Sequence, residues 1–252
     1  MDIEQFKLFL KNNFIIINYP TGCFGGFLAT TLCIAEENSL LKDNLNKKEK
    51  PLFTDNGSSH QNIVECFNNF HNYDHLNEWV KLNNSERLNY LYENCLVKET
   101  DGEKFFIMLI CCPSYSNELN EFFNEQKIVT IKPEPNQYKL LTELIFYKGS
   151  NNFENSKIFT KFKINNFEKN IDKIKRISAE KSSKFFIETI DYNQKYLYSF
   201  VSLFEEETFL ETLKKIETQL DLKLNYSIAS KLYKDFMKLN KHYFKLCNLE
   251  IV

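Results

Sequence analysis

The chain contains 252 residues, of which 43% are hydrophobic and 26% are charged, so it is long enough to bury a sizeable core and has an ordinary globular composition. Its formal net charge of −2 gives no overall attraction to nucleic acid or to an anionic membrane, although local basic patches are compatible with that charge. The apolar runs, such as residues 14–17 and 105–112, are far shorter than the ~20 residues of a membrane span, and the N-terminal segment carries acidic residues where a secretion signal carries basic ones. We therefore expect a cytoplasmic protein that has neither a membrane nor a nucleic acid as its partner.

Cysteine and arginine usage refines this expectation. The seven cysteines are scattered and include no CxxC pair, so neither a disulfide framework nor a zinc site is predicted. His71 and His75 have the i, i+4 spacing of a helical pair, but no third ligand accompanies them, and we predict no bound metal. Arginine occurs only at Arg87 and Arg176, a bias that the codons of an AT-rich genome produce. A viral source is therefore a hypothesis, and the compartment would then be the host cytoplasm or the virion.

The first predicted elements are a helix and a buried strand. Apolar spacing predicts an amphipathic helix over 3–12, and the run FIIINY at 14–19 predicts a strand buried on both faces. A glycine-rich turn and a helix from about residue 26 to residue 37 follow. Residues 39–98 are expected to be an excursion from the core, polar and turn-rich at first and helical from residue 62 onward.

Strands and helices then alternate along the rest of the chain. Further strands are predicted at 104–112, 127–132, 184–190 and 196–204. Further helices are predicted at 116–126, in the second half of 133–149, at 205–220 and, after a cap at Asn225 or Ser227, in the last part of the chain. The short crossover from Cys112 to Lys127 favours adjacent parallel strands. This alternation predicts one domain over 1–252, with a three-layer αβα architecture and a mainly parallel sheet.

Glycine is concentrated at the junction between the first strand and the next helix. Three of the six glycines fall within five residues, at Gly22, Gly25 and Gly26. Where a strand turns abruptly into a helix, the first N–H groups of the helix lack helical partners, and the helix dipole adds partial positive charge. Because glycine permits positive φ and a close approach by a ligand, the cluster predicts an anion site, most often for phosphate. The alternative is a plain tight turn in which glycine allows the helix to pack closely on the sheet.

Two common phosphate-binding motifs do not match this junction. The segment GCFGGFLA (22–29) does not end in Gly-Lys-Ser/Thr, so it lacks the lysine and the hydroxyl group of a Walker loop. It also differs from the G-x-G-x-x-G pattern of dinucleotide-binding folds. A loop that binds phosphate without hydrolysing it fits the sequence better.

The stretch IIINYPTGCFGGFLATTL (15–32) resembles the opening of sulfotransferase-like P-loop proteins, especially divergent and often viral members with a Pro-x-Gly-x-x-Gly-x-Phe-Leu loop. Residues 105–135 are similar to the family's strand, short helix and second strand, which ends near the 3′-phosphate site. Residues 196–222 are similar to its late strand, acidic turn and helix, so the stretches that carry the resemblance are spread over most of the chain, from residue 15 to residue 222. It implies the P-loop nucleotide-binding fold, with 3′-phosphoadenylyl sulfate as the cofactor.

The resemblance also implies a set of binding residues. The backbone donors that would hold the 5′-phosphate come from Thr21, Gly22, Cys23, Phe24, Gly25, Gly26 and Phe27. Lys132 stands where the family has an arginine, and Thr142 is the hydroxyl residue nearest to the position of its serine, so both would contact the 3′-phosphate. His60, in the loop TDNGSSHQN (54–62), is our candidate for the general base, because histidine is suited to proton transfer near pH 7.

Three functions stay open at this point. The leading hypothesis is a sulfotransferase that transfers sulfate from 3′-phosphoadenylyl sulfate to a hydroxyl or amine acceptor. The second is a catalytically degenerate P-loop fold that serves as a binding or structural module, for example in a virion. The third is a glycosyltransferase that uses a nucleotide sugar, because glycine-rich turns after a first strand also hold diphosphates. Protein partners are compatible with each of them.

Overall fold

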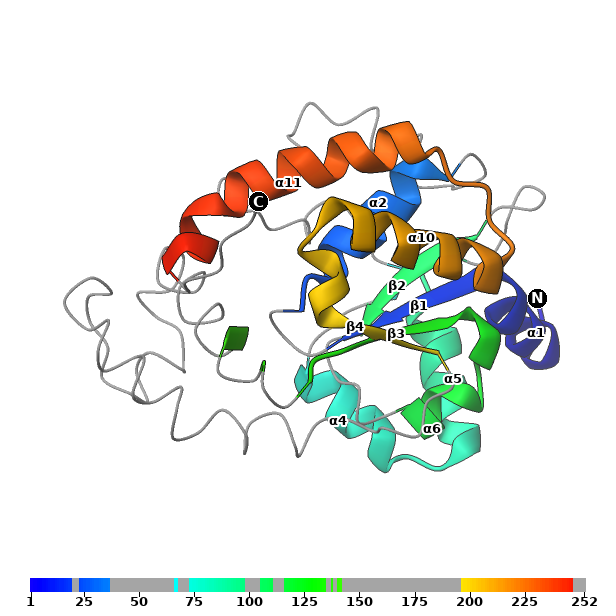
Figure 1. The fold of residues 1–252 in the computed structure, drawn as a ribbon. Helices are drawn as coiled ribbons and strands as arrows, with labels where there is room; N and C mark the ends of the chain where they lie inside the picture. Colours follow the sequence, from blue (N-terminus) through cyan, green and yellow to red (C-terminus); the bar gives the residue numbers. More distant parts are fainter. Residues whose placement is uncertain are drawn as a thin grey trace, which may run out of the picture.

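The computed structural model of the chain describes residues 1–19, 23–36, 66–67, 73–97, 105–110, 116–134, 137, 140–141 and 196–246. In this part of the chain, four parallel strands form a sheet in the order β2-β1-β3-β4, with helices on both faces (Figure 1). The strands are β1 (Phe14–Asn18), β2 (Phe106–Ile110), β3 (Ile128–Lys132) and β4 (Leu197–Ser199). The predicted α/β class with a mainly parallel sheet is therefore confirmed.

β1 occupies the centre of this sheet. All five of its residues are buried, as expected for a central strand of a parallel sheet. Ile16 pairs with Met108 of β2 on one side and with Ile128 of β3 on the other. The expectation that the short crossover joins adjacent strands is therefore wrong, because β1 lies between β2 and β3. Since neighbouring strands are about 4.8 Å apart, passing over one strand requires a span of only about 10 Å, which a short segment covers.

Three helices cover one face of the sheet, which we call the α2 face. They are α2 (Gly25–Ala35), α10 (Glu206–Leu220) and α11 (Tyr226–Leu246) (Figure 1). The strand residues that contribute to the core on this face alternate along the strands and are Ile15, Ile17, Ile107, Val129 and Ile131. Nearly every residue of α2 is buried, which explains why this helix is apolar on all sides.

The C-terminal end of α2 is held by the loop between α10 and α11. The N–H group of Asn225 donates to the carbonyl oxygen of Ala35 at 3.0 Å, and the N–H group of Lys223 donates to the buried Glu36 carboxylate at 2.6 Å. Glu36 also forms an isolated antiparallel bridge with Leu224. These contacts join segments that lie far apart in the sequence.

Four helices cover the opposite face, which we call the α1 face. They are α1 (Ile3–Asn13), α4 (Tyr73–Lys81), α5 (Asn84–Asn94) and α6 (Ser116–Asn120). The alternate strand residues fill the core on this side, namely Phe14, Ile16, Phe106, Met108 and Ile128. α4 and α5 lie within the excursion predicted at 39–98, and their buried residues Leu76, Trp79 and Leu91 belong to this core. Phe67, predicted to be helical, instead bridges to Cys95, and its ring lies 5.4 Å from that of Phe14.

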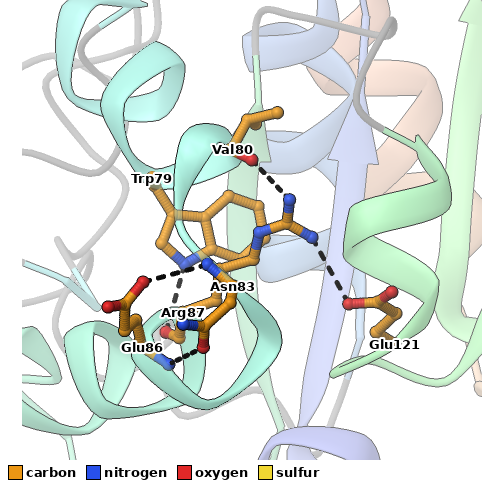
Figure 2. A network of polar contacts seen from close by, with 6 residues as sticks. All are labelled: Trp79, Val80, Asn83, Glu86, Arg87 and Glu121. Atoms are coloured by element: carbon orange, nitrogen blue, oxygen red, sulfur yellow. Dashed lines mark hydrogen bonds and ion pairs between the residues drawn. The ribbon is translucent and has the colours of Figure 1, made fainter.

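Arg87, on α5, links this helix to α4 and to the turn that follows α6 (Figure 2). Its guanidinium group lies over the Trp79 ring at 5.5 Å from the centroid, donates to the carbonyl oxygen of Val80, and pairs with Glu121 at 3.4 Å. In return, the indole N–H of Trp79 donates to the carbonyl oxygen of Arg87 at 3.1 Å. The planar fork and delocalised charge of arginine make these contacts together, which a lysine would not do. At the start of α5, the N-cap residue Asn83 and Glu86 in the first turn form a capping box.

Two C-terminal elements differ in how closely they follow the sequence prediction. The side chain of Asn225 accepts a hydrogen bond from the Ile228 N–H at 3.1 Å, so Asn225 is the cap of α11. The strand predicted at 196–204 stops at Ser199, and Phe200–Leu203 form a 3₁₀ helix, η6. The reason is that Phe200 and Leu203, three residues apart, are both buried, and a 3₁₀ turn places such residues on one side. Among the described residues, none of the helices is long and apolar enough to cross a membrane.

Candidate functional site

The strand order locates a candidate site at the carboxyl ends of the strands. From β1 the chain passes to β2 on one side, and later it passes to β3 on the other side. In open parallel sheets, ligands bind outside the carboxyl ends of the strands at the point where the connections change direction. For this sheet that point lies between the carboxyl ends of β1 and β3, where Asn18 and Lys132 end their strands.

α2 begins at this end of the sheet with an unusual backbone turn. Phe24, the residue before the helix, has φ 55° and ψ 25°, which is the left-handed region that bulky side chains rarely adopt. The helix then begins with Gly25 and Gly26, and among the described residues no side chain caps it. A left-handed residue followed by a right-handed helix turns successive N–H groups toward a common point, where an anion can bind.

The side chain of Phe24 is fixed by a group of aromatic rings. Its ring centroid lies 5.1 Å from that of Phe236, 5.7 Å from those of Phe200 and Phe244, and 5.9 Å from that of Phe204. Phe24 is only 8% exposed. A left-handed conformation costs about 1–3 kcal/mol in a non-glycine residue, and burial of a phenylalanine side chain contributes about 1.5–3 kcal/mol, so this packing can offset the strain.

Gly25 is required by the packing of Tyr19. A Cβ atom at Gly25 would lie 2.1 Å from Cδ1 of the Tyr19 ring, which is closer than any real contact. Tyr19 is 2% exposed, and its N–H donates to the carbonyl oxygen of Ile110 at 3.0 Å, so the ring has little freedom to retreat. Close helix–sheet packing, which was the alternative explanation of the glycine cluster, therefore accounts for this one glycine without a ligand.

Lys132 also lies at the carboxyl end of the strands, but its place in β3 puts it on the α1 face of the sheet, opposite to α2. Thr130 is the partner of Asn18 in the register, and Lys132 is two residues further along β3, so all three belong to the α1 face. The ammonium group of Lys132 lies 3.8 Å from the Glu134 carboxylate, and the side chains of Lys132 and Glu134 are 25% and 47% exposed. The structure thus brings the start of α2 and Lys132 to one end of the sheet but does not place them on one face.

Asn18 and Thr130 are buried polar residues that the sequence analysis did not single out. They are neighbours in the pairing of β1 with β3, and each is 0% exposed. A polar residue inside an otherwise apolar strand, as in FIIIN and IVTIK, is the sequence signal that could have identified them. They add hydrogen-bonding groups at the point where the carboxyl ends of the two strands meet.

Several predicted site residues lie outside the described residues. These are Thr21, Gly22, His60 and Thr142. Cys23, Gly26 and Phe27 are described, and all three are buried at the start of α2. Among the described residues, no three histidine, cysteine, aspartate or glutamate side chains are grouped so that they could hold a metal ion. Comparison of the chain with protein-family models, with curated proteins and with solved structures gives no match.

Proposed function

We propose that the chain binds the 5′-phosphosulfate end of 3′-phosphoadenylyl sulfate at the start of α2 and transfers the sulfate to a hydroxyl or amine acceptor. The observation that carries this proposal is the start of α2, which follows left-handed Phe24 and lies at the change in strand order between β1 and β3. Helix starts of this kind bind phosphate in many nucleotide-binding folds. The nature of the nucleotide rests on the sequence resemblance.

The proposed reaction assigns roles to the predicted residues. The acceptor atom forms a bond to sulfur while the bond from sulfur to the bridging oxygen of the nucleotide breaks, and adenosine 3′,5′-bisphosphate leaves. N–H groups of the segment from Thr21 to Phe27 would stabilise the negative charge that develops on the leaving oxygen. His60 would accept the proton of the acceptor, and Lys132 and Thr142 would bind the 3′-phosphate.

Lys132 can serve this role despite the face from which it starts. Its position at the very end of β3 lets the flexible side chain extend past the edge of the sheet. The ion pair with Glu134 is long and partly exposed, and such pairs contribute about 0–1 kcal/mol, so a phosphate can compete with the carboxylate.

A binding module without catalysis is the second candidate, and specific contacts favour it. Tyr19 packs directly on Gly25, and four aromatic rings surround Phe24, so the start of α2 is tightly enclosed on the α2 face. Such packing suits a fold that binds a nucleotide for stability or assembly rather than one that opens for an acceptor.

Calorimetry separates these functions. Adenosine 3′,5′-bisphosphate should bind wild type more tightly than adenosine monophosphate by roughly ten- to a hundredfold, because a hydrogen bond to a charged group contributes about 1.5–3 kcal/mol. Lys132→Ala should abolish the difference between the two ligands. Lys215→Ala, which removes an exposed lysine on α10, is the matched control and should preserve it.

Equal affinities that do not respond to Lys132→Ala would contradict the sulfotransferase assignment. Preferential binding of the bisphosphate without transfer of sulfate to any acceptor would support the binding module instead. If neither nucleotide binds, the phosphate site itself is wrong.

A further inference from the structure

The longest helix, α11, carries a row of lysines on its solvent-facing side. Lys231, Lys234, Lys238 and Lys241 follow one another at spacings of three, four and three residues, and all four are exposed. Residues three and four apart lie on the same side of a helix, so these lysines form one line about 15 Å long. We call this line the lysine stripe.

Within the part of the chain that the structure describes, three of the four stripe lysines form no ion pair, and Asp235 is the acidic residue beside them, four residues after Lys231 and three before Lys238. Lys234 pairs with Glu206 of α10 at 3.2 Å. Among the described residues, no ion pair involves Lys231, Lys238 or Lys241. Asp235 is the one exposed acidic residue among positions 226–241 of α11, so this part of the helix has a net charge of +3.

The other side of α11 is buried, which fixes how the stripe is presented. Leu232, Phe236 and Phe244 belong to the core on the α2 face, and the rings of Phe236 and Phe27 stack at 4.0 Å. α11 lies at the outer surface of its layer (Figure 1). The helix therefore has no continuous apolar side left for insertion into a membrane, and its packing against the core keeps the four lysines on its outer side.

We propose that the lysine stripe binds the sugar–phosphate backbone of nucleic acid without recognising the bases. A linear polyanion matches a single file of positive charges. A flat anionic surface matches it less well, because Glu207 and Glu211, also exposed, lie on the neighbouring helix α10 and would face that surface as well.

The residue types of the stripe explain why this binding is independent of sequence. Lysine is a compact point charge that lacks the rigid fork of arginine, so it pairs with a phosphate in many orientations. The aromatic side chains of α11 whose burial is described, Tyr226, Tyr233, Phe236 and Phe244, are at least partly buried, so they offer no exposed stacking platform for bases. Binding rests on phosphate neutralisation alone.

This proposal departs from the expectation, based on net charge, that nucleic acid is not a partner. Exposed charges are screened beyond about 8–10 Å at physiological salt, so a strand lying on α11 responds to the stripe rather than to the total charge of −2. The proposal is independent of nucleotide binding at the start of α2.

The test is fluorescence anisotropy of a labelled oligothymidylate of about 20 nucleotides. Three or four neutralised phosphates predict a slope of about −2 to −3 for log affinity against log salt, and thus a loss of roughly 20- to 50-fold between about 50 and 200 mM salt. The triple variant Lys231→Gln, Lys238→Gln, Lys241→Gln should bind at least tenfold more weakly at low salt and show a slope near −0.7. Oligoadenylate should bind wild type within about threefold of oligothymidylate, because the bases are not recognised.

Two further triple variants complete the test. Lys81→Gln, Lys215→Gln, Lys223→Gln removes three exposed lysines elsewhere and changes the net charge equally, so it should keep wild-type affinity. Replacement of Lys231, Lys238 and Lys241 by arginine should keep binding, which shows that the helix surface tolerates substitution. Equal losses in the two glutamine variants, no loss in the stripe variant, or binding to vesicles containing phosphatidylserine but not to the oligonucleotide would each overturn the proposal.

Discussion

Gly25, at the start of α2, packs against the ring of Tyr19, the residue that follows β1, and its missing side chain has a measurable consequence. Gly25→Ala places a methyl group against the Tyr19 ring and should lower the free energy of unfolding by about 1–3 kcal/mol, the usual cost of overpacking. Urea denaturation measures this change. Tyr19→Ala removes the obstacle, so the double variant should be less destabilised than the sum of the two single variants. Additive effects would contradict the proposed contact.

Arg87 makes contacts with Trp79 and Val80 that a lysine at this position would not reproduce. Arg87→Lys keeps the charge but loses the fork and the stacked plane, and it should lower the free energy of unfolding by about 1.5–3 kcal/mol. Glu121→Gln is the matched change on the partner. Because Glu121 is 39% exposed, its substitution should cost less than about 1 kcal/mol. Thermal denaturation distinguishes the two, and equal shifts would show that the ion pair, rather than the contacts with Trp79 and Val80, dominates.

The helix α11 begins at a cap for which the sequence offered two candidates, Asn225 and Ser227, and the structure shows Asn225 in that role. Asn225→Ala should destabilise the protein by about 1 kcal/mol, because its side chain accepts the Ile228 N–H. Ser227→Ala lies two residues further on at an exposed position and should change the stability by less than about 0.5 kcal/mol. Chemical denaturation of both variants checks the assignment of Asn225 as the cap. A larger loss of stability in Ser227→Ala than in Asn225→Ala would contradict it.

The attachment of α10 to the start of β3 gives the fold a dependence on alkaline pH. Gln219 donates to the carbonyl oxygens of Gln126 and Ile128 and accepts from the Tyr198 hydroxyl at 2.5 Å. Burial, with a smaller contribution from Tyr196, raises the pKa of Tyr198 from 10.0 to about 12. The folded state therefore holds this proton more tightly than the unfolded state, and the stabilisation is complete below pH 10 and is lost as the pH rises through 12.

We expect the urea concentration at the denaturation midpoint of wild type to decrease as the pH is raised from 10 to 12. Tyr198→Phe should be less stable at neutral pH because Gln219 loses a donor, and its midpoint should fall less steeply over that pH range. Urea melts at a series of pH values provide the measurement. Parallel pH profiles for the two proteins would assign the alkaline transition to other groups.

How much of these elements could be predicted depended on how local their causes are. The capping side chain at Asn225 and the apolar runs of β1, β2 and β3 are visible within a few residues, and their elements were found. The position of β1 between β2 and β3 could not be predicted, because each of the three apolar strands is suitable for the central position and long-range packing decides the order. The same limit applies to the site: three clustered glycines mark a special turn, but only the fold shows that Gly25 faces Tyr19 and that Lys132 starts from the opposite face.

For the whole molecule, the enclosure of α2 by the C-terminal helices determines when the fold can form during synthesis. α2 leaves the ribosome early, yet the rings that surround Phe24 and the loop that holds Glu36 belong to residues 200–244. At about 5–20 residues per second, translation of the intervening segment takes roughly 10–40 s, during which this nearly all-apolar helix lacks its partners in α10 and α11. The outer side of α2 therefore stays uncovered by its C-terminal partners until α11 has been synthesised.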